Sequence, residues 1–222
     1  MLRQYVIALI VLCGVTSVSA QEPVPNSGAA AKIDLQQVAP GDHWTYEVKD
    51  EIVGTILRTR TDMVTDVSKN EIAVRFDVAD TGRSGNLIYD RSWNILREEP
   101  FKYSPNNGTG IQLPLTLGAQ WKFAIDVTNS RNGLTFRRIG NSKVTAKESI
   151  TTKAGTFETF VIETNYAGKN IQDPTLINES SDRTWFSLDV NHWVKRNIVR
   201  RQRGHVTENN TIELIDYGHK KQ

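Results

Sequence analysis

Few residues in this sequence are of the types that carry catalytic or metal chemistry, and they stand far apart. The histidines include no pair at the spacing of a His-Glu-X-X-His motif, and the chain has a single cysteine. No serine lies in a Gly-X-Ser-X-Gly elbow, and the glycines form neither a phosphate-binding loop nor a dinucleotide fingerprint. We therefore expect no metal and no cofactor, and we interpret the four histidines as structural: His43, His192, His205 and His219.

Paired carboxylates are the one enzymatic arrangement that the sequence leaves open. A glycoside hydrolase needs two acids that face each other across a cleft, and these can lie far apart in the chain. With 25 acidic residues, chance pairs are common, so no residue is assigned a catalytic role. A hydrolase of envelope glycans is kept as an alternative, and the acids available to it are Glu98, Glu99, Asp126, Glu163 and Asp189.

The strongest charge feature is a run of cations between positions 195 and 203. On a strand, alternation places Lys195, Arg201 and Arg203 on one face and Arg196 and Arg200 on the other. This split favours a long solvated strand whose charges pair with their neighbours. The alternative is that these five cations contact an anionic partner, such as lipid headgroups or an acidic envelope polymer.

Tryptophans form the second group of candidate binding residues. Trp44 and Trp121 each follow a glycine by three residues at the start of an alternating run, which is typical of a core position. Trp93, Trp185 and Trp193 are less constrained. We expect these three at the mouth of a cavity, where they would bind an apolar or amphipathic ligand.

The elements that must position these residues are β-strands, and their pattern occurs twice. The glycines that open the two runs are 77 residues apart (118 − 41 = 77), and a second glycine pair is 79 apart (133 − 54 = 79). We predict a duplicated four-strand unit: unit one at 41–99, a loop at 100–117, unit two at 118–203 and a last strand at 208–217. In this scheme Leu87–Glu98 and Arg183–Arg203 are each one strand.

No stretch has the apolar spacing of a helix, so the predicted fold class is all-β. Turns of a few residues between strands favour an antiparallel meander, because parallel pairing would need long crossovers. A curved antiparallel sheet of this width closes into a barrel or half-barrel.

The ends of the chain predict an exported protein. Residues 1–20 have an early cation, an apolar run that contains Cys13, and small residues before a cleavage site, as in a secretory signal peptide. Residues 21–40 are interpreted as a flexible leader, 41–218 as a single β domain and 219–222 as a polar tail. We expect no membrane-spanning segment once the signal is cleaved. The near balance of 27 cations and 25 acids gives no reason to expect nucleic acid as a partner.

Part of unit two resembles a pattern found in uncharacterised bacterial envelope β-proteins, a family of domains of unknown function. The pattern comprises Ala154-Gly155-Thr156-Phe157, then Arg183-Thr184-Trp185, then His192-Trp193-Val194-Lys195-Arg196. Here His192-Trp193 stands where those proteins more usually have a glycine. Such proteins are similar in outline to the lipoprotein carriers of the periplasm, whose half-barrels hold acyl chains. The resemblance implies a periplasmic setting and no catalytic residues.

Taken together, these features predict a periplasmic or secreted, non-catalytic β domain. Its partner would be a lipid, an amphipathic small molecule or an envelope protein. The alternative to a ligand cavity is a protein-interaction module that uses a sheet edge or the cationic strand.

Overall fold

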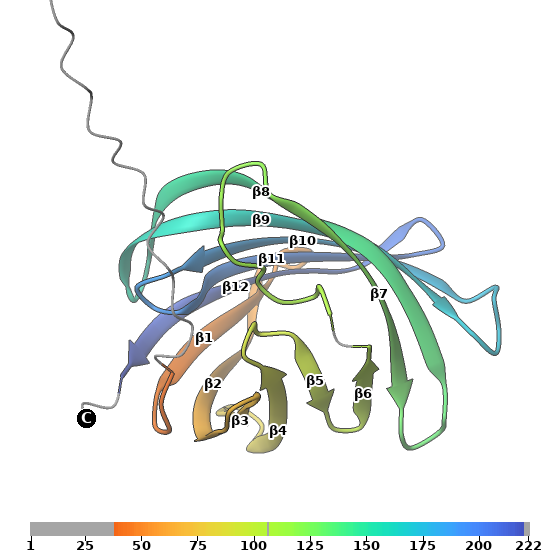
Figure 1. Ribbon diagram of the computed structural model, residues 1–222, viewed down its shortest axis with the longest axis horizontal. Coiled ribbons are helices and arrows are strands. Elements are labelled where there is room, and N and C mark those ends of the chain that lie inside the picture. Colours follow the sequence, from red (N-terminus) through yellow and green to blue (C-terminus); the bar gives the residue numbers. More distant parts are fainter. Residues whose placement is uncertain (1–37, 106, 220–222) are drawn as a thin grey trace, which may run out of the picture. The chain divides into compact units, whose positions relative to one another are not determined.

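The computed structural model describes residues 38–105 and 107–219, all within one compact unit, Lys32–Gln222 (Figure 1). The predicted signal peptide, residues 21–37 of the predicted leader and residues 220–222 lie outside the described residues. The strands are β1 (His43–Asp50), β2 (Thr55–Val67), β3 (Glu71–Val78), β4 (Arg83–Asp90), β5 (Ile95–Glu98), β6 (Phe101–Ser104), β7 (Gln120–Asn129), β8 (Thr135–Thr152), β9 (Gly155–Asn170), β10 (Ile177–Ser187), β11 (His192–Gln202) and β12 (His205–Gly218). Within the described ranges, no helix is long and apolar enough to cross a bilayer.

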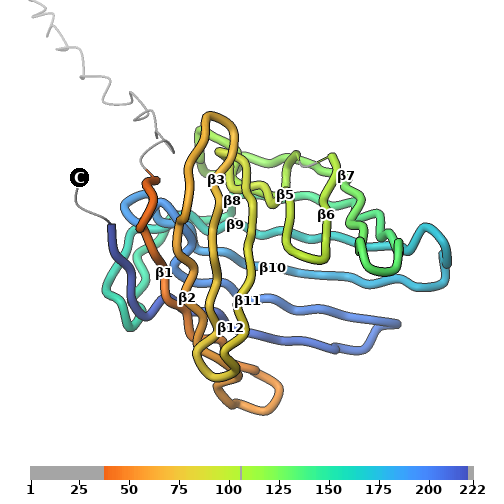
Figure 2. Tube along the Cα trace, turned by 90° about the horizontal axis from the view of Figure 1, so that it is seen from below, coloured from red at the N-terminus to blue at the C-terminus, as the bar shows by residue number. Residues whose placement is uncertain are grey.

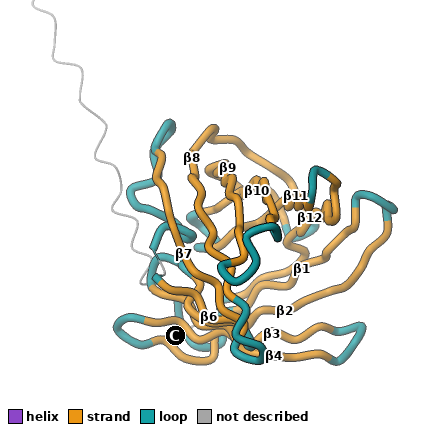
Figure 3. Tube along the Cα trace, turned by 90° about the vertical axis from the view of Figure 1, so that its right-hand side faces the viewer, coloured by secondary structure: helices purple, strands orange, loops and turns teal. Residues whose placement is uncertain are grey.

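The strands form a closed antiparallel barrel, which confirms the predicted fold class. Each strand pairs with the next along the chain, and β1 pairs with both β2 and β12. Figures 2 and 3 show this meander wrapping around a common interior. Closure leaves no strand of the described chain with a free edge along its whole length, and partial edges remain at 83–86 of β4 and 120–125 of β7.

The two halves of the barrel begin with the same hydrogen-bond pattern. The amide of Gly41 donates to the carbonyl of Val64 at 2.8 Å, and the amide of Gly118 donates to that of Val144 at 2.9 Å. Both glycines have a positive φ, 98° and 85°, which a residue with a Cβ rarely adopts. A β-bulge follows directly after each valine, in β2 and in β8. The repeated glycines therefore mark equivalent turns.

Three expected boundaries differ from the structure. Leu87–Glu98 is two strands, β4 and β5, separated by a turn, and Arg183–Arg203 is divided in the same way into β10 and β11. The sequences of these turns resemble those of strands because they contain apolar residues. In each turn one residue other than glycine has a left-handed backbone conformation: Trp93 (φ 60°) in the first and Asn191 (φ 52°) in the second. The predicted loop 100–117 also contains the short strand β6. Each half consequently has six strands, β1–β6 and β7–β12.

One end of the barrel is filled by apolar side chains. We call the end at which β1 and β7 begin the packed end. Trp44, Phe186 and Val190 are fully buried there. The segment 107–117 completes the packing, since its Ile111 and Leu115 belong to the same cluster. A smaller cluster lies further along β7 and consists of Phe123, Ile125 and Val127, with Tyr103 and Tyr166 against it.

Gly140 in β8 marks a position in the barrel wall where added bulk is not tolerated. A Cβ there would lie 2.7 Å from Phe123 Cζ and would also overlap the Asn165 carbonyl oxygen and Tyr166 Cβ. We expect Gly140→Ala to lower the free energy of unfolding by about 1–3 kcal/mol, because a strand backbone would have to shift. Urea unfolding of the purified protein measures this change. Asn141→Ala, at the exposed neighbouring position, is the control, and equal loss in both variants would contradict the prediction.

Candidate functional site

A cavity of about 230 Å³ lies inside the barrel, beyond the packed end. Its walls come from both halves of the chain and from the segment 107–117. Six of its lining residues are aromatic: Tyr89, Trp93, Tyr103, Phe123, Tyr166 and Trp193. Five more are isoleucines: Ile95, Ile111, Ile125, Ile162 and Ile198. Such a wall suits an apolar or aromatic part of a ligand.

Charged side chains also line this cavity, and cations outnumber acids. Arg138, Arg196 and Arg200 contribute three guanidinium groups, whereas Asp182 is the only acid among the described lining residues. Arg196 Nη2 donates to Asp182 Oδ2 at 3.3 Å, and Arg200 Nη1 donates to Glu208 Oε2 at 2.7 Å. No ion pair is found for Arg138 among the described residues. The interior therefore combines apolar walls with an excess of positive charge.

Strand alternation and one bulge bring the residues of β11 to the cavity. Phe186 pairs with Trp193 and Trp185 pairs with Lys195, so Val194 is an extra residue in β11. The bulge lets Trp193 and Arg196 face the same interior although they are three positions apart. Beyond it, ordinary alternation directs Arg196, Ile198 and Arg200 inward.

A buried histidine lies in an aromatic cluster between the packed end and the cavity. The His192 ring stacks on Trp44 with centroids 4.2 Å apart and an interplanar angle of 15°. The Tyr46 hydroxyl donates to the Trp193 carbonyl at 2.9 Å, so its oxygen is left to accept from His192 Nδ1 at 2.5 Å. Burial lowers the pKa of His192 well below its usual range, and Arg196 lowers it further. The imidazole is therefore neutral and part of a rigid floor under the cavity.

The structure brings four of the eight candidate site residues together. Trp93, Trp193, Arg196 and Arg200 all line the cavity. Trp185 does not line it, because alternation places its side chain on the outer face of β10, where the indole Nε1 donates to Glu148 Oε1 at 2.6 Å.

The remaining three cations of the 195–203 run are not at the cavity. Lys195 faces outward, with its Nζ 3.8 Å from Glu213 Oε2. Arg201 is paired with Glu179 of β10 in the strand register, and Arg203 lies in the turn before β12. The run is thus divided between the inside and the outside of the barrel.

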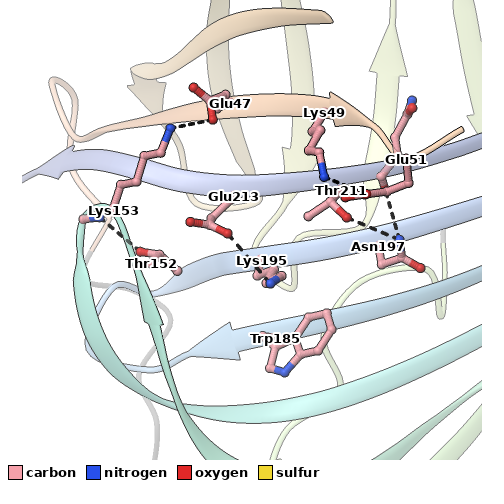
Figure 4. Close-up of polar contacts among 12 residues, drawn as sticks. Glu47, Lys49, Glu51, Thr152, Lys153, Trp185, Lys195, Asn197, Thr211 and Glu213 are labelled. Carbon is pink, nitrogen blue, oxygen red and sulfur yellow. Dashed lines mark hydrogen bonds and ion pairs between the residues drawn. The ribbon is translucent and has the colours of Figure 1, made fainter. Parts of the chain in front are cut away.

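The outer face of β1, β11 and β12 carries alternating charges that pair with one another (Figure 4). Lys153, in the β8–β9 turn, is 2.7 Å from Glu47, and Lys49 is 2.8 Å from Glu51. Exposed pairs of this kind contribute little to stability but keep a solvated face soluble. This face fits the interpretation of paired strand charges better than that of a free cationic patch.

The acids considered for glycoside hydrolysis do not meet at the cavity. Asp126 is held by a bidentate pair with Arg137 on the outer face, at 2.6 and 2.7 Å. Glu163 lies in a shallow outer depression rather than in the barrel interior. No two carboxylates line the cavity within the described residues, and those residues also hold no cluster of three or more His, Cys, Asp or Glu side chains suited to a metal ion.

Several lining residues were not identified from the sequence, above all Arg138 and Tyr166. Arg138 lies in β8, where Arg138, Gly140 and Ser142 share the inward face with buried Val144. An arginine in phase with a buried valine is the signal that could have identified it. The signal is weak because this part of β8 has no apolar alternation of its own.

Comparisons with known proteins agree with the fold. Residues 108–197 match the model of the DUF3108-like family, and this segment contains the whole predicted pattern. The predicted resemblance to an uncharacterised bacterial β family is confirmed. The chain is similar to the crystal structure of a candidate lipoprotein from Parabacteroides distasonis, with a TM-score of 0.55, 13% identity and coverage of 81% of this chain and 96% of the other.

A second similar structure is a candidate exported protein with a YmcC-like fold from Bacteroides fragilis. Its TM-score is 0.56 at 10% identity, and the match covers 82% of this chain and 97% of the other. No curated protein matches the sequence. At these identities the likeness concerns the fold alone.

The buried His192 predicts a barrel that loses stability in mild acid. The folded-state pKa of His192 is well below the usual 6.5, whereas the unfolded chain binds a proton near that usual value. The contribution of His192 to the free energy of unfolding is therefore fully present above about pH 6.5. Below that pH it falls by up to about 1.4 kcal/mol per pH unit, until His192 protonates in the folded barrel. Urea unfolding at pH 7.5 and pH 5.5 measures the difference.

In His192→Gln this part of the pH dependence should disappear, whatever the absolute stability of the variant. His205→Gln removes an exposed histidine and should keep the wild-type slope. The same slope in wild type and His192→Gln would show that His192 is not the titrating group.

Proposed function

We propose that this protein is an exported, non-catalytic binding protein that holds an amphipathic small molecule in the barrel cavity. The observation that carries the proposal is the composition of the cavity wall, in which aromatic and isoleucine side chains adjoin three arginines. A purely structural core would have no reason to keep charged groups beside apolar ones, since burying a charge costs stability.

Export is supported by the first twenty residues and by the similar structures. Residues 1–20 have the composition of a secretory signal peptide. Proteins of similar fold are described as a candidate lipoprotein and a candidate exported protein. We therefore place the folded domain in the periplasm or outside the cell.

The size of the cavity limits the ligand. At about 230 Å³ it is smaller than the roughly 300–1,000 Å³ of sites for drug-sized ligands. A single alkyl chain or one small aromatic molecule fits this volume better than a lipid with several chains. Part of a longer ligand would remain outside the barrel.

A cationic interaction surface is less well supported than the cavity. Arg196 lines the cavity, the side chain of Arg200 is about half exposed at 49%, and Lys195 is paired with Glu213 on the outer face. Because Lys195 and Arg196 lie on opposite faces of β11, the five cations are less suited to an anionic polymer than the cavity is to a small ligand.

Partly filling the cavity should weaken ligand binding. Thr184 of β10 lines the cavity, and Thr184→Phe would occupy part of its volume. With the uncharged probe N-phenyl-1-naphthylamine, we expect saturable binding at one site in the wild type, seen as a rise in probe fluorescence. In Thr184→Phe we expect affinity to fall by about tenfold or more.

Thr211→Phe makes the same substitution on the outer face of β12 and should leave probe binding unchanged (Figure 4). Circular dichroism checks that both variants keep the β fold. Absence of saturable probe binding in the wild type, or equal affinity in wild type and Thr184→Phe, would contradict the proposal.

A further inference from the structure

We infer that the ligand of the cavity carries an anionic group, a carboxylate or a phosphate, and that Arg138 is the main contact for this group. The inference rests on the proposed function, because it concerns the polar end of the same ligand. Its basis is a comparison of the three cavity arginines and their partners.

Two of the three arginines already have a carboxylate partner. Arg196 donates to Asp182, whose other oxygen accepts a hydrogen bond from Ser180 Oγ at 2.6 Å. Arg200 donates to Glu208 from the neighbouring strand β12. Each of these two guanidinium groups therefore has a carboxylate of the protein as its partner.

Arg138 differs from both in having no carboxylate partner in the described part of the chain. In residues 38–105 and 107–219 no carboxylate lies within ion-pair distance of Arg138, and its buried Nε has no hydrogen-bond partner. Its guanidinium carbon lies 5.3 Å from the centre of the Tyr166 ring, which is an attraction but supplies no acceptor oxygen. Buried N–H groups are nearly always paired, so an uncompensated guanidinium facing a cavity indicates an acceptor that comes from outside the chain.

The chemistry of that acceptor follows from the donor. A guanidinium presents its N–H groups in a planar fork that matches two oxygens of a carboxylate or phosphate. The buried Nε of Arg196 is also unpaired and belongs to the same cavity lining, so a second donor is available to the anion. The surrounding apolar wall strengthens such a contact, because it lowers the local dielectric constant.

The neighbouring residue Arg137 shows that the unpaired state of Arg138 is specific to the interior. Arg137 faces outward and makes a bidentate pair with Asp126. Of these two adjacent arginines on β8, Arg137 therefore has a carboxylate partner in the protein and Arg138 has none among the described residues. This pair provides a matched control for mutagenesis.

The test compares twelve-carbon amphiphiles that differ only in the head: laurate, dodecanol and dodecyltrimethylammonium, each below its aggregation limit. Displacement of N-phenyl-1-naphthylamine reports the affinity of each. In the wild type we expect laurate to bind about tenfold tighter than dodecanol, and the ammonium compound to bind most weakly. Arg138→Met should remove the preference for laurate, and Arg137→Met should retain it.

Thermal unfolding without ligand separates a binding role from a structural one. Removal of an uncompensated cation should leave the Tm of Arg138→Met equal to or higher than that of the wild type. A Tm well below that of Arg137→Met would assign Arg138 to the fold and overturn the inference. Arg138→Lys, which keeps the charge but loses the planar fork, should recover part of the preference.

The remaining outcomes distinguish this inference from the proposed function. Equal affinities for laurate and dodecanol would overturn the inference that the ligand is anionic. A preference for laurate that survives in Arg138→Met would overturn the role of Arg138. Neither result would contradict an apolar ligand in the cavity. No saturable binding of any amphiphile or of the probe would overturn both the inference and the proposed function. Inorganic phosphate should compete with laurate only at much higher concentration. Phosphate binding as tight as that of laurate would identify a free oxyanion as the ligand and would overturn the proposal that the ligand is amphipathic.

Discussion

The pairing of β1 with both β2 and β12 is the constraint on which the rest of the molecule depends. Once the meander is closed, every second side chain along each strand must point into a shared interior. Barrels of about eight strands are just filled by their side chains, and barrels of sixteen or more enclose a channel. A barrel of this intermediate size, twelve strands in the described residues, needs an additional segment to seal one end and still retains a cavity.

The two regions of the interior follow different physical rules. At the packed end, Trp44 and His192 stack and Leu115 of the segment 107–117 is buried, as expected of a stable core. In the cavity, Arg138 and Arg196 occupy positions where a core would have aliphatic side chains. Natural sequences break the packing rules mainly where function requires it, which is why the cavity and not the aromatic cluster is the candidate site.

The candidate site lies where the two halves of the barrel differ. The halves begin alike, at the turns of Gly41 and Gly118. They diverge in strand length, since β3 has eight residues and β9 sixteen, and β5 has four residues whereas β11 has eleven. Two of the three cavity arginines, Arg196 and Arg200, come from β11. The short strands β5 and β6 also leave space that the segment 107–117 partly covers, and Gly110 and Ile111 of that segment line the cavity.

The sequence by itself determined the all-β class, the antiparallel order and the repeated glycine turns, because alternation and positive φ are local properties of a few consecutive residues. It also placed Trp44 and Trp121 correctly in the core. Local pattern could not divide 87–98 or 183–203 into two strands, since a four-residue turn with an apolar residue keeps the appearance of alternation.

Only the tertiary structure decided which face is inside in strands that lack a clear apolar alternation, such as β11 and the first part of β8. The bulge at Val194 shifts the phase of β11, so that Trp193 joins Arg196 in the cavity while Trp185, on the neighbouring strand, stays outside. The separation of Arg138 from Arg137 has the same origin. Their sequence neighbours are nearly identical, and only pairing with β7 and β9 in the closed barrel gives one arginine an acid partner and leaves the other facing the cavity. Whether such a side chain points into or out of the barrel depends on how its strand pairs with its neighbours in the closed sheet.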